Sequence, residues 1–228
     1  MHFFLLGASG RTGQKVVTEL LSQGHTAIAL VRSTASLTPR AGLTIVTGSP
    51  LSKPDIRNAL NAASTPLPSA AIFTLNTVRE SDSPFAKQVS PPRFLADSCA
   101  NACEILEEVG VRRIVVMSTA GVGDSWGNLS LLSKLFLGWT NVKLAVEDHG
   151  LLDKEIRETN MNFTLVRAVR LTFDEEKEEG ATKEVRVLSS SGEGMRMSDS
   201  VSVQTVAQFL LKVAIEGLYS RRAVVVTN

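Results

Sequence analysis

The stretch that decides the fold is Met1–Ser33, MHFFLLGASGRTGQKVVTELLSQGHTAIALVRS. His2–Leu6 is an apolar run with the length and content of a buried strand, and it stops at a glycine-rich turn. Apolar residues then recur at helical spacing between Gln14 and Gln23, and a second apolar run, Thr26–Val31, follows. Strand, glycine turn, helix and strand in this order predict one βαβ unit with a phosphate-binding loop at the turn.

Three glycines in the turn have the spacing that a bound dinucleotide needs. Gly7 permits a tight turn off the strand, Gly10 lets the backbone approach a pyrophosphate, and Gly13 lets the helix pack closely on the sheet. The start of the helix presents free N–H groups and a partial positive charge to phosphate. We therefore expect nucleotide binding here rather than a purely structural turn, through Gly7, Ala8, Ser9, Gly10, Arg11, Thr12 and Gly13.

The end of the second strand selects the nucleotide. An NAD site would place Asp or Glu there to bind the ribose 2′-hydroxyl, whereas this chain has Arg32 followed by Ser33. A guanidinium suits a 2′-phosphate because its charge is permanent and its geometry is bidentate. Arg11, inside the turn, could reach the same phosphate. The sequence therefore predicts NADP(H) as the cofactor; the alternative is that both arginines are solvated surface residues.

The composition is that of an ordinary soluble globular protein. The 228 residues are 43% hydrophobic and 21% charged, with a net charge of +1. This fits one domain over residues 1–228 and leaves no charge field suited to nucleic acid or an anionic membrane. The first apolar run is too short for a signal peptide, and no segment has the length of a membrane span. Cys99 and Cys103 lie one helical turn apart, which indicates reduced thiols. We expect a cytoplasmic monomer or homodimer whose partner is a small-molecule substrate.

Apolar strands alternate with helical segments along the rest of the chain. This alternation predicts an α/β fold of Rossmann type, a doubly wound, mostly parallel sheet flanked by helices. Ligands of such sheets bind beyond the carboxyl ends of the strands. Strands are expected at 43–46, 70–75, 113–118, 162–167, 185–188 and 223–227, and helices at 53–63, 93–109, 129–139, 142–159 and 202–216. The strand ends then bring the glycine turn together with Arg32, Ser33, Thr74, Leu75, Asn76, Ser118 and Thr119.

Two segments, from about 120–140 and 168–200, are expected on the substrate side. Within the first, residues 129–139 form either a lid helix over a substrate or a helix packed on the sheet. Residues 77–92 contain Ser83-Pro84 and Pro91-Pro92 with little periodicity, which predicts a long surface loop, flexible near the cofactor. Asp174–Lys183 is expected to be an acidic, solvated loop.

Five segments resemble the NmrA-like, NAD(P)H-binding group of atypical short-chain dehydrogenase/reductases, of the biliverdin reductase B-like kind. The G-x-x-G-x-x-G spacing of the glycine turn is common in that class, and the similarity spans essentially the whole chain. The chain departs from the group at Ala168, where the group has Pro, at Ser49, where it has Asp, and at Gln204-Thr205, where it often has Arg and Asp. The five segments are FLLGASGRTGQ (4–14), LVRS (30–33), RRIVVMSTAG (112–121), VEDHGLLDKEIRETNMNFTLVRA (146–168) and VSVQTVAQFLLKVA (201–214).

A tyrosine mechanism is excluded, because it needs Tyr-x-x-x-Lys and the single tyrosine, Tyr219, is followed four residues later by Ala223. The resemblance instead implies a catalytic serine at the end of the fifth strand, where Ser118 and Thr119 lie. A hydroxyl there could hydrogen-bond a substrate carbonyl as charge develops on its oxygen. The alternative is that these residues cap a turn.

His149 is a second catalytic candidate, as a proton donor whose ordinary pKa lies near neutral pH. The alternative is a structural or exposed histidine. Asp148, its neighbour, is expected on a different helix face as a surface charge. The resemblance also implies that solvent can supply the proton.

These observations predict an NADPH-dependent reductase of a small, conjugated or aromatic organic substrate. Two alternatives stay open: a non-catalytic NADP(H)-sensing regulator of the NmrA type, and a dehydratase or isomerase on the same scaffold. The fold alone does not choose among them. No metal site is expected.

Overall fold

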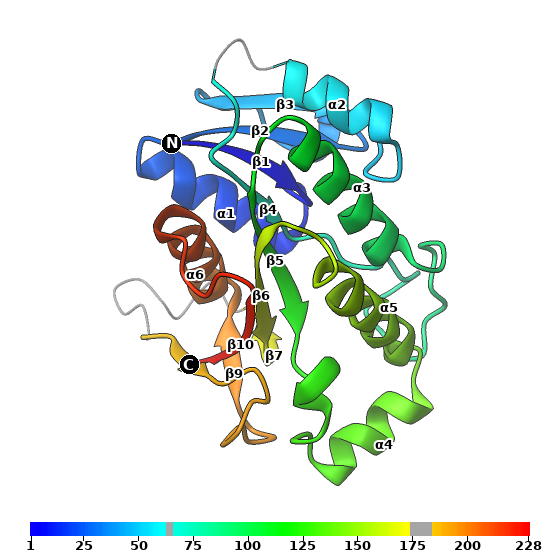
Figure 1. Cartoon of the computed structure of the whole chain (residues 1–228). Helices are drawn as coiled ribbons and strands as arrows, with labels where there is room; N and C mark the ends of the chain where they lie inside the picture. Colours follow the sequence, from blue (N-terminus) through cyan, green and yellow to red (C-terminus); the bar gives the residue numbers. More distant parts are fainter. Residues whose placement is uncertain (63–65, 174–183) are drawn as a thin grey trace.

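A parallel sheet between two layers of helices forms the body of the computed structural model, which describes residues 1–62, 66–173 and 184–228 (Figure 1). The sheet strands are β1 (His2–Leu6), β2 (Thr26–Val31), β3 (Leu43–Thr47), β4 (Ala70–Phe73), β5 (Arg113–Thr119), β6 (Asn162–Ala168), β8 (Arg186–Leu188) and β10 (Arg222–Thr227). The helices are α1 (Arg11–Ser22), α2 (Lys53–Asn61), α3 (Phe94–Glu108), α4 (Leu131–Trp139), α5 (Val142–Ile156) and α6 (Val203–Glu216), with short 3-10 turns η1 (Thr34–Ser36) and η2 (Gly123–Trp126).

The strand order is β3-β2-β1-β4-β5-β6-β10-β8, and within the described residues only β8 runs antiparallel to its neighbour. The predicted Rossmann-type fold is therefore confirmed. A separate parallel pair, β7 (Arg170–Thr172) and β9 (Ser200–Ser202), was not predicted.

The two faces of the sheet bury alternate side chains of the same strand. Phe3 and Leu5 of β1 pack in one core with α1 and α6, whereas Phe4 and Leu6 pack in a second core with α2, α3 and α5. Figure 1 shows these two helix layers on opposite sides of the sheet. The sequence of β1 is continuously apolar because both faces of this strand are covered.

The strand order reverses between β1 and β4, whose neighbours continue in opposite directions across the sheet. In doubly wound folds the crevice for ligands opens at such a reversal, outside the carboxyl ends of the strands. The turn after β1 and the segments after β4 and β5 all start at this edge.

Residues 77–92 form a long loop at the surface, as predicted, and part of this loop is paired. Val89 N donates to Val78 O at 2.8 Å and Glu80 N donates to Lys87 O at 3.0 Å, around an antiparallel bridge between Arg79 and Gln88. We call residues 78–90 the β4–α3 hairpin.

Helix α4 does not pack on the sheet, so this alternative for residues 129–139 is excluded. None of its residues is buried; Leu131 is 73% exposed and Trp139 is 82% exposed. It extends beside α5 at the edge of the molecule (Figure 1). The predicted acidic loop, Asp174–Lys183, lies outside the described residues.

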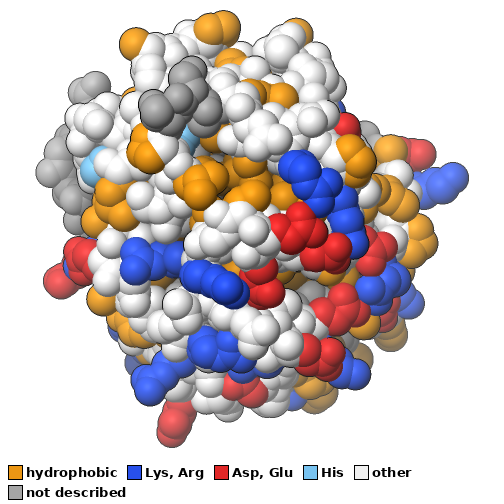
Figure 2. Space-filling view, turned by 45° about the horizontal axis from the view of Figure 1, so that its top comes forward, with side chains coloured by type: hydrophobic (Ala, Val, Ile, Leu, Met, Phe, Trp, Pro, Cys, Tyr) orange, Lys and Arg blue, Asp and Glu red, His pale blue; other side chains and the backbone are white. Residues whose placement is uncertain are grey.

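The molecular surface carries mixed charge. Figure 2 shows basic and acidic side chains interspersed over one face. Lys53 and Glu104 (2.5 Å) and Arg57 and Glu108 (2.6 Å) form ion pairs between α2 and α3. Of the helices described, none is long and apolar enough to cross a membrane.

Candidate active site

Two glycines shape the turn after β1, because a side chain at either position would collide with the backbone. Gly7 has a φ of +93°, and a Cβ on it would lie 2.6 Å from Leu75 N. A Cβ on Gly13 would lie 2.1 Å from Gly7 O, so this residue lets α1 pack directly against the turn. A Cβ on Gly10 would meet only Gly7 O, at 3.3 Å. Close packing within the chain therefore requires glycine less strictly at Gly10 than at Gly7 and Gly13.

Helix α1 begins without a side-chain cap. Gly10 occupies the N-cap position, and no acidic residue lies in the first turn. The turn is closed by Gly10 N donating to Gly7 O at 3.0 Å, and Gln14 Nε2 donates to Ser9 O at 2.9 Å. An uncapped helix start leaves N–H groups free for an anion, and the positive end of the helix dipole favours one.

The crevice at the strand-order reversal is a cleft of about 580 Å³, which runs from this helix start to α5. Three of the predicted site residues do not line it: Ala8 and Gly13 are buried under the turn, and Ser33 is exposed beyond β2. The predicted residues that do line it are Gly7, Ser9, Gly10, Arg11, Thr12, Arg32, Thr74, Leu75, Asn76, Ser118, Thr119 and His149.

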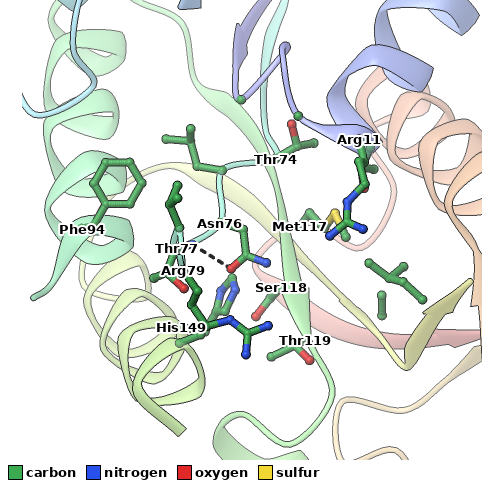
Figure 3. A pocket seen from close by; sticks show the side chains of 18 of the residues that line it. Arg11, Thr74, Asn76, Thr77, Arg79, Phe94, Met117, Ser118, Thr119 and His149 are labelled. Carbon is green, nitrogen blue, oxygen red and sulfur yellow. Dashed lines mark hydrogen bonds between the residues drawn. The ribbon is translucent and has the colours of Figure 1, made fainter. Parts of the chain in front are cut away.

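Ser118 and His149 face this cleft from β5 and α5, with buried polar atoms that lack partners. Ser118 is 3% exposed and His149 is 5% exposed. Neither Ser118 Oγ nor His149 Nδ1 makes a hydrogen bond to any residue that the structure describes. Figure 3 shows the two side chains at the same end of the cleft, close to Asn76. Unpaired buried polar groups are costly, and a ligand bound in the cleft could pair with these two.

The protonation of His149 differs from the expected one. Burial lowers its pKa from 6.5 to about 4, and the nearby negative charge of Asp153 opposes this only partly. His149 is therefore a neutral imidazole at pH 7. It can donate or accept a hydrogen bond, but it does not supply a proton as an imidazolium. The expectation of a proton donor whose pKa lies near neutral pH is therefore corrected.

The remaining candidates are partly engaged within the chain. Thr119 Oγ1 donates to Ala120 O at 3.2 Å, and Thr74 Oγ1 donates to Leu6 O at 3.3 Å. Asn76 Oδ1 accepts from Thr77 N at 2.8 Å, the dashed line of Figure 3. Each of these side chains therefore keeps only part of its hydrogen-bonding capacity for a ligand.

The two predicted phosphate-binding arginines have different surroundings. Arg11 lies 4.0 Å above the ring of Phe173 and 3.4 Å from Asp82. Arg32 is exposed at the edge of the cleft and has no ion-pair partner among the described residues. Arg32 is thus freer than Arg11 to bind a phosphate group such as the 2′-phosphate of a nucleotide.

Asp148 is not a surface charge, and the expectation for it was wrong. Its side chain is 4% exposed, and its carboxylate accepts from Leu95 N (2.9 Å) and Ala96 N (3.1 Å) at the start of α3. The carboxylate thus caps a helix from another element. Its spacing in the sequence could not indicate this, because the two partners lie more than fifty residues away.

A buried arginine cluster joins β6 to η2 and α5, and the sequence analysis missed it. Arg167 is fully buried in β6 and forms ion pairs with Asp124 of η2 and with Asp153 of α5, the latter at 2.6 Å. Its guanidinium also donates to Ser190 O at 2.6 Å. A charged residue in an otherwise apolar strand was the available signal, since such a residue is buried only when paired.

The comparisons with known proteins agree with this geometry. A family model described as NAD(P)H-binding matches residues 7–216, so the chain belongs to this family. A search among curated proteins finds no match.

Solved structures share the whole fold at low sequence identity. The anaerobilin reductase ChuY of Escherichia coli O157:H7 has a TM-score of 0.75 at 18% identity, over 99% of this chain and 96% of that one. A short-chain dehydrogenase/reductase of Veillonella parvula, solved in complex with NADP, has a TM-score of 0.75 at 19% identity, over 100% and 94%. A putative NAD-dependent epimerase/dehydratase of Bacillus halodurans has a TM-score of 0.73 at 18% identity, over 100% and 94%. These structures show that the fold is shared, and the family match bears out the expected NAD(P)H-binding group.

The cleft fits the dinucleotide that the family binds. The uncapped start of α1 and the glycine turn suit a pyrophosphate, and the unpaired Ser118 Oγ and His149 Nδ1 lie at the other end. Among the residues described, no group of three His, Cys, Asp or Glu side chains could hold a metal ion.

Proposed function

We propose that the protein is an NADPH-dependent reductase of a small conjugated organic substrate. One observation carries the proposal: the buried, unpaired hydroxyl of Ser118 lies in the same cleft as the uncapped helix start. With the pyrophosphate of a dinucleotide at the helix start, this hydroxyl would lie at the other end of the cleft, where the nicotinamide and a hydride acceptor would meet. The reductase named among the similar structures supports this direction.

The roles of the residues follow from their positions. The turn from Gly7 to Gly13 and the first turn of α1 would hold the pyrophosphate, and Arg32 the 2′-phosphate. NADPH, when bound, supplies a hydride, that is, two electrons and one proton nucleus. Ser118 would donate its hydroxyl hydrogen bond to the acceptor oxygen, and the neutral His149 would orient the acceptor or a water. One proton from solvent completes the reduction, so the products are the reduced substrate and NADP⁺.

Substitution of Ser118 tests this assignment. We expect Ser118→Ala to lower kcat about 10²- to 10³-fold, the loss seen when one oxyanion donor is removed. The Kd for NADPH should stay the same, because the phosphates anchor the cofactor. The measurement is NADPH oxidation with a panel of quinones, flavins and tetrapyrroles, beside cofactor titration. Unchanged turnover would remove Ser118 from the mechanism, and tight NADPH binding without turnover in the unmodified protein would favour the sensing role.

The choice of cofactor depends on Arg32. Arg32→Asp should raise the Kd for NADPH about 10- to 150-fold, since a charge-assisted contact is lost and repulsion is added. The Kd for NADH should change little. Isothermal titration with both nucleotides measures the difference, and equal losses would show that Arg32 does not contact the 2′-phosphate.

A further inference from the structure

One more cation lines the cleft, and none of the roles above uses it. Arg79 is half-buried, and its Nη1 donates to Ser83 O at 2.9 Å. Arg79 forms no ion pair with any acidic residue in the described part of the chain. Asp82, the acidic side chain lining the cleft nearby, pairs with Arg11 instead. The Arg79 guanidinium therefore keeps most of its donors and its whole charge.

The main chain holds Arg79 in place. It lies in the paired part of the β4–α3 hairpin, directly at the bridge to Gln88. Ser90 Oγ accepts from Val78 N at 2.7 Å next to it. The tip of the hairpin is fixed to the start of α5, because Asn141 Nδ2 donates to Phe85 O at 2.9 Å. A guanidinium on a fixed support loses less conformational entropy when it binds a ligand.

Arg79 lies toward the end of the cleft that holds Ser118 and His149, away from the helix start. In Figure 3 its side chain extends toward Ser118, Thr119 and His149, which line the same cleft. Arg11 and Thr74 lie at the opposite end of this view. The uncapped helix start that suits the pyrophosphate belongs to that opposite end, so the cofactor's phosphates are expected away from Arg79.

We propose that Arg79 binds an acidic substituent of the substrate, a carboxylate or a phosphate. This proposal rests on the proposed function. A guanidinium offers two parallel N–H donors to an oxyanion, and the neutral His149 in the same cleft does not compete for the negative group. Phe94, Val142 and Ala145 line the cleft with apolar surface, which suits a flat ring system. The substrate class is therefore a conjugated hydride acceptor that carries an acidic side group.

Two probes with the same reducible ring test this proposal, FMN and riboflavin, which differ by one phosphate. Binding of each to the protein saturated with NADP⁺ is measured by flavin fluorescence, and reduction by NADPH is measured separately. We expect FMN to bind at least about tenfold more tightly than riboflavin, as a charge-assisted contact allows. Arg79→Met keeps the side-chain length and should abolish this preference through weaker FMN binding, with riboflavin unchanged.

Two controls separate the possible sources of the effect. Arg112→Met removes an exposed arginine that is not among the cleft residues and should leave the preference intact. NADP⁺ affinity of Arg79→Met should equal that of the unmodified protein; a loss there as large as the loss for FMN would assign Arg79 to the cofactor's phosphates and overturn the proposal. FMN binding no better than riboflavin to the unmodified protein would also overturn it. Preferential FMN binding without turnover would support the role of Arg79 while contradicting the reductase function.

Discussion

At the scale of single residues, substitution of two glycines in the same turn should have different effects, one on cofactor binding and the other on stability. A side chain on Gly13 would collide with backbone at 2.1 Å, whereas one on Gly10 would meet only Gly7 O at 3.3 Å and otherwise extend into the cleft. Gly10→Val should therefore fold and lose NADPH binding, because its side chain occupies the space of the pyrophosphate. Gly13→Ala should lower the free energy of unfolding by about 1–3 kcal/mol or more, since the helix must move away.

Thermal unfolding and NADPH titration of both variants measure this difference. A Gly10→Val protein that melts like the unmodified one but binds no cofactor agrees with the prediction. Normal NADPH binding by Gly10→Val would place the phosphate site elsewhere.

At the scale of elements, the buried carboxylate of Asp148 joins α5 to the first turn of α3. It satisfies two backbone N–H groups that the helix itself cannot pair. Asp148→Ala should therefore lower the free energy of unfolding by about 2 kcal/mol, the loss of a cap combined with two unsatisfied buried donors. Glu147→Ala, an exposed neighbour on the same helix, is the matched control and should change it little. Urea unfolding measures both, and equal effects would show that the cap does not stabilise α3.

At the scale of the whole molecule, His149 makes the stability of the fold depend on pH. Burial lowers its pKa to about 4 in the folded chain, whereas the unfolded chain takes up a proton near the ordinary value of 6.5. Between these values the unfolded state binds more protons, so stability is full above about pH 6.5 and falls as the pH drops toward 4. From pH 7.5 to 5 we expect a loss of about 2 kcal/mol from this one group.

His149→Gln isolates that contribution, because glutamine does not titrate in this range. Burial also lowers the pKa of His2 and His25, which stay in both proteins, so the difference between the two unfolding profiles reports His149 alone. Identical pH profiles for the unmodified protein and the variant would show that His149 titrates normally in the folded chain.

The sequence by itself determined the elements whose signals are local. The βαβ unit, the long helices and the parallel strands follow from hydrophobic period and glycine placement, and the strand ends of a parallel sheet necessarily share one edge. That rule was enough to predict that Arg32, Thr74 and Ser118 line one cleft, as they do. The chemical roles of these residues stay predictions.

Only the tertiary structure decided what depends on contacts between distant segments. The cap by Asp148, the ion pairs of Arg167, the pairing of the β4–α3 hairpin and the placement of Arg79 all join residues whose separation carries no periodic signal. The protonation of His149 belongs to the same group, because a pKa is set by the burial and charge that surround a side chain. Sequence pattern reports which face of an element is apolar, whereas partners and desolvation exist only after the elements have packed.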